Sequence, residues 1–189
     1  LLLRDNVLHR NQIERAYLKA IGLARHEVLI ANAYFLPGRR LRQALVHAAR
    51  RGVRVRLLVQ GRYEYFMQYH AARPVYGTLL AAGVEIYQYD ASFLHAKVAV
   101  VDAHHERPWA TVGSSNLDPL SLLLAREANV VVADRVFAQG LHLRLSDVIA
   151  TQSTPVAESF KHRYWHQRWR DRMAFGLMRL ALFITGHRY

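Results

Sequence analysis

The chain has 189 residues, 52% of them hydrophobic, which fits one folded domain with a sizeable core and argues against disorder. Its 26 basic and 14 acidic residues give a net charge of +12, which indicates a polyanionic partner such as anionic lipid or nucleic acid. The absence of cysteine excludes disulfides, thiol nucleophiles and cysteine-based zinc sites. The chain begins with Leu1, and it has neither a signal peptide pattern nor an apolar run of about 18 residues, so we expect a fragment of a longer protein without a transmembrane helix.

Helical and strand patterns alternate through the first 150 residues. Helices are expected where apolar residues recur every three to four positions, and strands where β-branched residues alternate or cluster. The expected order is a lead-in over 1–10, helix 11–24, strand 28–35, helix 41–51, strand 53–59, helix 68–82 with a break near Pro74, strand 84–89, strands 95–102 and 110–112, strand 128–133, and helix 135–149. Asn11 and Asp134 are expected to cap their helices. This order predicts an α/β sandwich with a mixed, mostly parallel sheet.

A dense basic stretch and a group of tyrosines lie in the middle of this pattern. The basic stretch consists of Arg39, Arg40, Arg42, Arg50, Arg51, Arg54 and Arg56. It is either a solvated helix and loop surface or a patch that faces phosphate groups. Four tyrosines follow it, and they are either core residues or the lining of an acyl or glycerol channel: Tyr63, Tyr65, Tyr69 and Tyr76.

The composition changes near residues 151–155, so we divide the chain into a domain over 1–152 and a tail over 153–189. The tail interleaves arginines with tryptophans and aliphatic residues, and its segment 173–184 is too short to span a bilayer. Such a pattern is typical of a helix that lies in a membrane interface. The alternative is a helix that packs on another part of a longer protein.

Residues 93–120 gather the side chains that suggest chemistry. His95 and Lys97 lie two apart on the expected strand 95–102, so they point to one face, while Val98 and Val100 point to the other, towards a core. The next strand, 110–112, ends in a Gly-Ser-Ser-Asn turn. Separately, these are an ordinary strand face and an ordinary turn. Together, an imidazole, an ammonium, hydroxyls and an amide suit a phosphoryl group.

The pattern resembles the HKD motif of the phospholipase D superfamily, and its positions are filled here by His95, Lys97, Asp102, Gly113, Ser114 and Asn116. Residues 103–112 exceed the spacing of about six that is usual there, and we place the excess, roughly 104–108, in a longer hairpin tip. Segments 31–37, 116–121 and 127–129 resemble bacterial cardiolipin synthases. The resemblance is to the second of their two HKD repeats, and it covers about residues 1–150.

The resemblance implies a phospholipase D-like α/β sandwich that forms one repeat of a normally two-repeat protein. In that family one histidine attacks phosphorus and forms a phosphohistidine, and the other protonates the leaving alcohol and activates the incoming one. His95 is then the nucleophile or the general acid/base, with the acid role preferred. Neither a metal nor another cofactor is expected, because Lys and Asn side chains stabilise the developing charge. His104 and His105 are expected in a solvated hairpin tip.

The resemblance also implies roles for the other motif residues. Lys97, Ser114 and Asn116 would hold the phosphate, and Gly113 would support them. Asp102 belongs to the catalytic motif, yet we expect it to act structurally by orienting backbone or a neighbouring side chain. Glu127 either hydrogen-bonds a catalytic histidine or is an ordinary strand-end carboxylate.

The implied activity is cardiolipin synthesis, by transfer of a phosphatidyl group onto phosphatidylglycerol. The expected location is peripheral, at the cytoplasmic face of the bacterial inner membrane. The expected partners are anionic phospholipids, the membrane surface, and either the N-terminal HKD repeat of the same parent chain or a homodimer mate; nucleic acid is not expected. The alternatives are a phospholipase D-like phosphodiesterase or nuclease, and an inactive isolated half.

Overall fold

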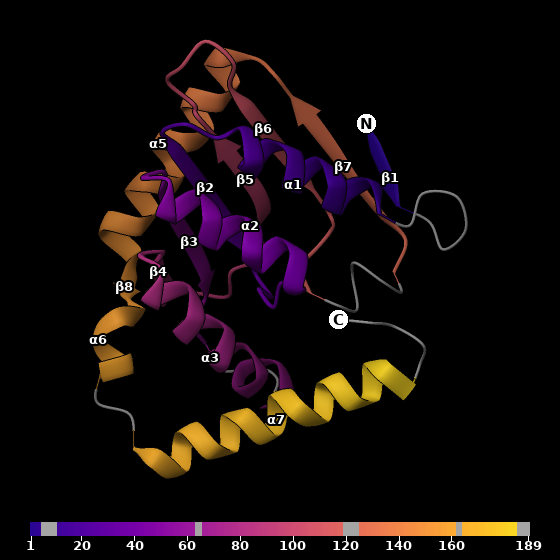
Figure 1. The fold of residues 1–189 in the computed structure, drawn as a ribbon. Helices are drawn as coiled ribbons and strands as arrows, with labels where there is room; N and C mark the ends of the chain where they lie inside the picture. The colour runs from indigo at the N-terminus through magenta and orange to yellow at the C-terminus, as the bar shows by residue number, and fades with distance from the viewer. Residues whose placement is uncertain (5–10, 63–65, 119–124, 162–163, 185–189) are drawn as a thin grey trace.

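The computed structural model describes residues 1–4, 11–62, 66–118, 125–161 and 164–184. The strands of this part of the chain are β1 (Leu2–Arg4), β2 (Glu27–Asn32), β3 (Arg54–Gln60), β4 (Glu85–Tyr89), β5 (Lys97–Val101), β6 (Trp109–Gly113), β7 (Glu127–Val132) and β8 (Ser153–Pro155). The helices are α1 (Gln12–Leu23), α2 (Arg39–Arg50), α3 (Phe66–Ala81), α5 (Arg135–Gln152), α6 (Val156–Lys161) and α7 (Trp165–Ile184). Helices and strands alternate as the sequence predicted, and the pattern closes into one sheet with helices on it (Figure 1).

Within the described residues the sheet has eight strands in the order β1-β7-β6-β5-β2-β3-β4-β8. It is mixed, as predicted, but the prediction that it is mostly parallel is wrong. Only the pairs β2–β3 and β3–β4 are parallel, and the other described neighbours are antiparallel. The reason is that α2 and α3 each cross over between neighbouring strands, whereas β5, β6 and β7 follow one another along the sheet without such a crossover.

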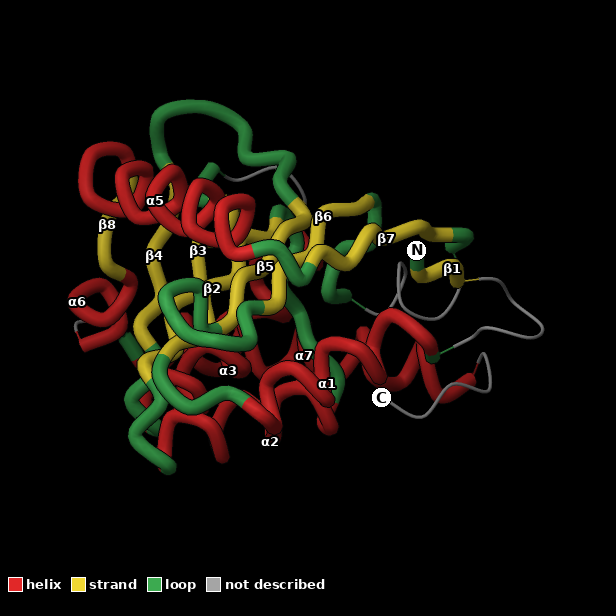
Figure 2. The backbone as a smooth tube through the Cα atoms, turned by 90° about the horizontal axis from the view of Figure 1, so that it is seen from above, coloured by secondary structure: helices red, strands yellow, loops and turns green. Residues whose placement is uncertain are grey.

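Helices cover both faces of the sheet (Figure 2). Helix α5 lies on one face, and α1, α2, α3 and α7 lie on the other. Strand β2 shows why: Val28 and Ile30 pack in the larger core under α1–α3, while Leu29 and Ala31 pack in the smaller core under α5. A strand buried on both faces reads as a continuous apolar run, as β2 does.

Local sequence signals placed most boundaries, with three corrections. Asp134 caps α5 through its Oδ1, which accepts a hydrogen bond from the Phe137 N–H at 2.7 Å, but the Asn11 side chain makes no capping bond to α1. Helix α3 is not interrupted and passes through Pro74. Strand β5 begins at Lys97, because its partner β2 ends opposite, at Asn32.

The chain after residue 152 joins the same sheet. Strand β8 pairs antiparallel with β4, and α7 runs along the edge of the molecule beside α3 (Figure 1). A buried contact joins these helices, with His70 Nδ1 2.7 Å from Asp171 Oδ1. The expected boundary therefore falls between α5 and an edge strand of the same sheet. Among the described residues, no helix combines the length and apolarity needed to cross a membrane.

Candidate active site

Four strand ends meet at one edge of the sheet. The carboxyl end of β2 pairs with the amino end of β5, so Asn32 lies opposite Lys97. The carboxyl end of β6 pairs with the amino end of β7, so Gly113 lies opposite Asn129. Because β5 also pairs with β6, residues from four separate parts of the sequence converge at this edge.

A strip of buried polar side chains marks this edge. It consists of Asn32, Lys97, Thr111, Ser115 and Asn129. Within the described residues three polar atoms here have no hydrogen-bond partner, namely Asn32 Nδ2, Asn116 Oδ1 and Asn129 Oδ1. A buried polar group without a partner costs about 1–3 kcal/mol. Such groups are rare in folded proteins, and when they cluster they indicate a site that a polar ligand completes.

Lys97 is the cation of this strip. Its side chain points to the same face as Ala99 and Val101, which belong to the larger core. The residue is only 7% exposed, and its Nζ donates a hydrogen bond to the His95 carbonyl oxygen at 3.2 Å. Burial lowers the pKa of Lys97, although Glu127 and Asp118 oppose that shift. An ammonium that has lost hydration in this way gains free energy from an anionic ligand.

His95 precedes β5 and is exposed to solvent. Two contacts hold the segment that leads to it. The Leu94 N–H donates to Gln60 Oε1 at 3.2 Å, and Arg62 Nη2 donates to the Ala91 carbonyl oxygen at 2.7 Å. The imidazole is therefore accessible beside Lys97, which is what a nucleophile or general acid requires.

The pairing of β6 with β7 is stabilised by three residues, namely Gly113, Ser114 and Glu127. The Ser114 hydroxyl donates to Glu127 Oε2 and accepts from the Ala128 N–H, the latter at 3.1 Å. Of the two roles considered for Glu127, neither included this bond to Ser114. A Cβ on Gly113 would overlap the Asn129 side chain and the Ala128 carbonyl oxygen, so only glycine fits there.

Asn116 lies at the same edge because its neighbour Leu117 is hydrogen-bonded to the last residue of β2. The Leu117 N–H donates to Asn32 Oδ1 at 3.1 Å, and the Leu117 carbonyl oxygen accepts from the Leu36 N–H at 2.9 Å. Since Asn32 is the register partner of Lys97, these bonds place residue 116 near the lysine. Asn32 was not assigned to the site from the sequence, although it is an amide at the end of an apolar strand and lies in the resembling segment 31–37. The resembling residues 119–121 lie outside the described part of the chain.

Asp102 lies at the opposite end of β5, roughly 16 Å from Lys97 at about 3.3 Å per residue. Its carboxylate accepts hydrogen bonds from the N–H groups of Arg25, His26 and Glu27 at 2.8–2.9 Å. Partial burial raises the pKa of Asp102, but these backbone bonds outweigh it and hold the pKa below its usual value. The geometry separates Asp102 from the other motif residues and favours its structural role, which is to fix the start of β2.

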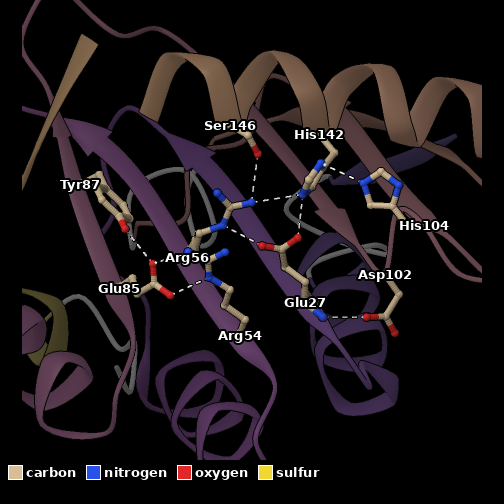
Figure 3. A network of polar contacts seen from close by, with 9 residues as sticks. All are labelled: Glu27, Arg54, Arg56, Glu85, Tyr87, Asp102, His104, His142 and Ser146. Atoms are coloured by element: carbon tan, nitrogen blue, oxygen red, sulfur yellow. Dashed lines mark hydrogen bonds and ion pairs between the residues drawn. The ribbon is translucent and has the colours of Figure 1, made fainter. Parts of the chain in front are cut away.

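A paired polar network accompanies Asp102 at that end of the sheet (Figure 3). Glu27 contacts Arg56 Nε and His142 Nε2, both at 2.7 Å, and Arg56 also donates to Ser146 on α5. His104, from the hairpin tip, lies 3.2 Å from His142. No pattern in the sequence predicts this network, because it depends on where α5 crosses the sheet.

The hairpin tip holds the excess residues of the motif, because Val101 pairs with Trp109 and residues 102–108 connect them. His104 and His105 are exposed there, and the His105 ring stacks on His26 with centroids 3.4 Å apart. No group of three or more metal-ligating His, Cys, Asp or Glu side chains occurs within the described residues.

A pocket opens beside the polar strip, at the carboxyl ends of the parallel strands, where α/β folds commonly bind ligands. Together with the open solvent at its mouth, it comprises about 520 Å³ of space not filled by protein atoms. Tyr69 and Tyr76 from α3 line it, together with Arg73 and Asp118. The other two tyrosines of that group, at positions 63 and 65, lie outside the described residues.

The basic stretch divides into structural and exposed arginines. Arg51 donates to the carbonyl oxygens that end α1, Arg54 pairs with Glu85 at 2.8 Å, and Arg56 belongs to the buried network. Arg39, Arg40 and Arg50 are exposed. The exposed arginines fit a solvated surface, the bonded arginines fit neither interpretation, and a patch that faces phosphate groups stays a prediction.

Residues 17–148 match the family described as "Cardiolipin synthase, PLD-like domain". Cardiolipin synthase B of Escherichia coli K12 is 47% identical over 187 residues, which cover 98% of this chain and 44% of that protein. The minor cardiolipin synthase of Bacillus subtilis is 30% identical over 156 residues, covering 82% of this chain and 38% of that protein. The chain thus spans less than half the length of these relatives.

Two solved structures share the fold. Nuc of Salmonella typhimurium, a phospholipase D family member, aligns with a TM-score of 0.65 and 20% identity over 77% of this chain and 91% of Nuc. Phosphatidylserine synthase of Haemophilus influenzae aligns with a TM-score of 0.70 and 14% identity over 95% of this chain and 45% of the synthase. At these identities the likeness concerns the fold alone. On the match over residues 17–148 and the 47% identity to a relative, the chain belongs to the phospholipase D-like domain family of cardiolipin synthases.

Proposed function

We propose that this chain supplies one of two half-sites of an enzyme that makes cardiolipin by phosphatidyl transfer. The observation that carries the proposal is the strand register that brings Lys97 and Asn116 to one edge of the sheet, with His95 exposed beside them. That set offers a proton carrier and charge-stabilising donors to one phosphodiester. The names of the relatives support cardiolipin as the product.

The proposed reaction has two displacements. The histidine of the other half-site attacks phosphorus of phosphatidylglycerol, so a P–N bond forms as the P–O bond to glycerol breaks. His95 gives its proton to the departing glycerol oxygen. His95 then takes the proton of an incoming phosphatidylglycerol hydroxyl, whose oxygen attacks phosphorus as the P–N bond breaks. Lys97 and Asn116 hold the non-bridging oxygens while charge develops on them.

A second half-site is required because the chain contains a single His-x-Lys sequence, at residues 95–97. It comes from the N-terminal repeat of a parent chain or from a second copy of this chain. The incomplete coverage of the relatives supports the first source. A strictly monomeric, isolated chain would then be inactive, and activity of the isolated chain would require a homodimer.

Helix α7 supports a peripheral membrane location. Its solvent-facing side carries an apolar stripe, in which Trp165 is 79% and Trp169 is 62% exposed, followed by Met173, Leu177 and Leu180. Arg170, Arg172 and Arg179 are exposed alongside, and their charge complements anionic headgroups. The opposite side of α7 packs on α3 through Asp171 and Ala174. We propose that this stripe lies in the cytoplasmic face of a bacterial inner membrane.

The proposed function is tested with labelled phosphatidylglycerol in vesicles, using the full-length parent and its His95→Ala form. We expect cardiolipin and free glycerol from the parent and a loss of several orders of magnitude in the variant, with unfolding unchanged. Phosphatidic acid as the only product would make the enzyme a hydrolase. Metal-independent cleavage of single-stranded DNA without lipid turnover would support the nuclease alternative, with which the charge of +12 is also compatible.

A separate flotation assay tests the membrane contact. Chains that carry Trp165→Ser and Trp169→Ser should float with anionic vesicles markedly less than the wild type does. An Arg50→Ser chain, altered at an exposed arginine on α2, serves as the control. Equal flotation of all these chains would exclude α7 as the contact.

A further inference from the structure

Arg73 on α3 is a buried cation that forms no ion pair with any described residue. It is 6% exposed and lines the pocket beside the polar strip. Its contacts are aromatic: the guanidinium carbon lies 4.2 Å from the ring centroid of Tyr69 and 5.9 Å from that of Phe160. Within the described residues its guanidinium makes no ion pair within 4 Å and no side-chain hydrogen bond.

Such an arrangement is unfavourable unless an anion completes it. A guanidinium stays charged in proteins, and a buried charge needs a partner. Ring faces offset only part of the lost hydration. Two carboxylates border the region: Asp171 is hydrogen-bonded to His70 and lines a second pocket together with Arg73, and Asp118 acts on the ammonium of Lys97. Among the described residues, no ion pair within 4 Å joins either carboxylate to Arg73.

The pocket offers further donors to an anion. Arg62 lines it and is exposed, and the amide of Gln60 lines it next to the segment that carries His95. Tyr76 contributes a phenol, and burial raises its pKa while the nearby Arg73 opposes the shift, so this group stays a neutral donor at neutral pH. Of the described residues that line the pocket, Asp118 alone is acidic, and its charge acts on the ammonium of Lys97.

We propose that this pocket binds a second phosphodiester, the one that does not react. The inference rests on the proposed function, in which the phosphorus under attack is held at Lys97. The acceptor lipid carries its own phosphate, which must lie near the first one because a single glycerol joins the two in the product. Arg73 would hold that phosphate through its planar fork of N–H groups. The pocket would thereby favour a phosphate-bearing lipid, rather than water, as the acceptor of the phosphatidyl group.

Binding of dihexanoyl phosphatidylglycerol, below its micelle concentration, tests this on the 189-residue chain by calorimetry. We expect two sites per wild-type chain and one in Arg73→Met, with the lost site weaker by about 10- to 100-fold. Arg50→Met, which removes an equal charge from an exposed position, should keep both sites. Inorganic phosphate as a second probe separates recognition of phosphate alone from recognition of the lipid headgroup.

The variants also separate this inference from the proposed function. Lys97→Gln should lose the other site and keep the one at Arg73; two intact sites in Lys97→Gln would contradict the proposed function alone. Two intact sites in Arg73→Met would overturn the inference. Without lipid, Arg73→Met should unfold at the same temperature as the wild type or higher. If it fails to fold, Arg73→Lys, which keeps the charge but loses the fork, should fold and bind the second lipid more weakly, and unchanged binding would again overturn the inference.

Discussion

The two ends of β5 differ in how completely their polar groups are paired. At the Asp102 end, one carboxylate accepts three backbone hydrogen bonds, and Glu27, Arg56 and His142 form a connected network above it. At the Lys97 end, a buried ammonium is bonded to one carbonyl oxygen, and amide atoms of Asn32 and Asn116 have no partner within the described residues.

This difference in pairing assigns a stabilising role to the residues at one end of β5 and a reactive role to those at the other end. Paired groups hold the hairpin to the sheet and gain nothing from a ligand. Groups without partners lower stability in the free protein. An anion that pairs with the donors at the other end, the Lys97 ammonium and Asn32 Nδ2, recovers part of that free energy, whereas Asn116 Oδ1 is an acceptor and gains a partner only from a donor such as a ligand hydroxyl. A motif that reads as one unit in sequence therefore divides into a reactive end with His95 and Lys97 and a structural end with Asp102.

Replacing Lys97 with methionine should have the largest effect on turnover. We expect phosphatidyl transfer to fall by about a thousandfold, because one charged donor to the developing negative charge is lost. Stability at pH 7 should be equal or higher, because burial already disfavours the ammonium. Turnover of labelled lipid and urea unfolding measure the two quantities. A large loss of stability together with retained turnover would reverse the roles assigned to the two ends.

Asp102→Ala should show the opposite behaviour. Three hydrogen bonds to a charged acceptor are lost, and alanine replaces a residue with a φ of 49°. We expect the free energy of unfolding to fall by about 3 kcal/mol. Turnover per folded molecule should stay within about threefold of the wild type, since the carboxylate lies roughly 16 Å from Lys97. A thousandfold loss in well-folded protein would make Asp102 catalytic.

Gly113→Ala should have an intermediate effect at the reactive end. The added methyl group overlaps the Asn129 side chain and the Ala128 carbonyl oxygen, so β6 and β7 must separate locally. We expect a loss of about 1–3 kcal/mol in the free energy of unfolding. Gly140→Ala on α5, where an added Cβ meets nothing within 4 Å, is the matched control and should be neutral or stabilising. Equal stability of the two variants would contradict the tight pairing of β6 with β7.

The smallest effect concerns pH. The folded-state pKa of Asp102 is lowered, so its ionised form stabilises the fold above the unfolded value of about 3.9, and this stabilisation is lost as pH falls through the folded pKa. Asp102→Asn tolerates the positive φ but carries no charge, so it should be less stable than the wild type at pH 6. That difference should shrink between about pH 4 and pH 2. Urea midpoints of both proteins over this range measure it, and a difference independent of pH would contradict the assignment.

The sequence patterns correctly located most of the helices and strands, and the motif, along the chain, but they did not predict how the strands pair in the sheet. Apolar periodicity located β2 and α2, and side-chain alternation along a strand correctly placed Lys97 opposite Val98 and Val100. The direction of strand pairing was mispredicted because strand order is a property of the whole sheet, which local patterns do not encode.

The parts of the site that sequence reasoning missed depend on register or helix position. Asn32 enters the site because β2 ends opposite Lys97, and Asn129 because it lies opposite Gly113. Arg73 is buried beside the rings of Tyr69, on the same helix, and Phe160 on α6. The register contacts of Asn32 and Asn129 and the contact of Arg73 with Phe160 join segments far apart in the chain, which no spacing within the sequence predicts. The contact of Arg73 with Tyr69, four residues earlier on the same helix, is one that spacing does allow.

The most direct test of the central claim is a crystal structure of the chain with tungstate, a mimic of phosphate. The account predicts an anion within hydrogen-bond distance of Lys97 Nζ and Asn116 Nδ2, with the His95 ring facing it, and no anion at the Asp102 end of β5. The account would be contradicted if the anion bound elsewhere while this edge stayed empty, or if Lys97 and Asn116 lay on opposite faces of the sheet.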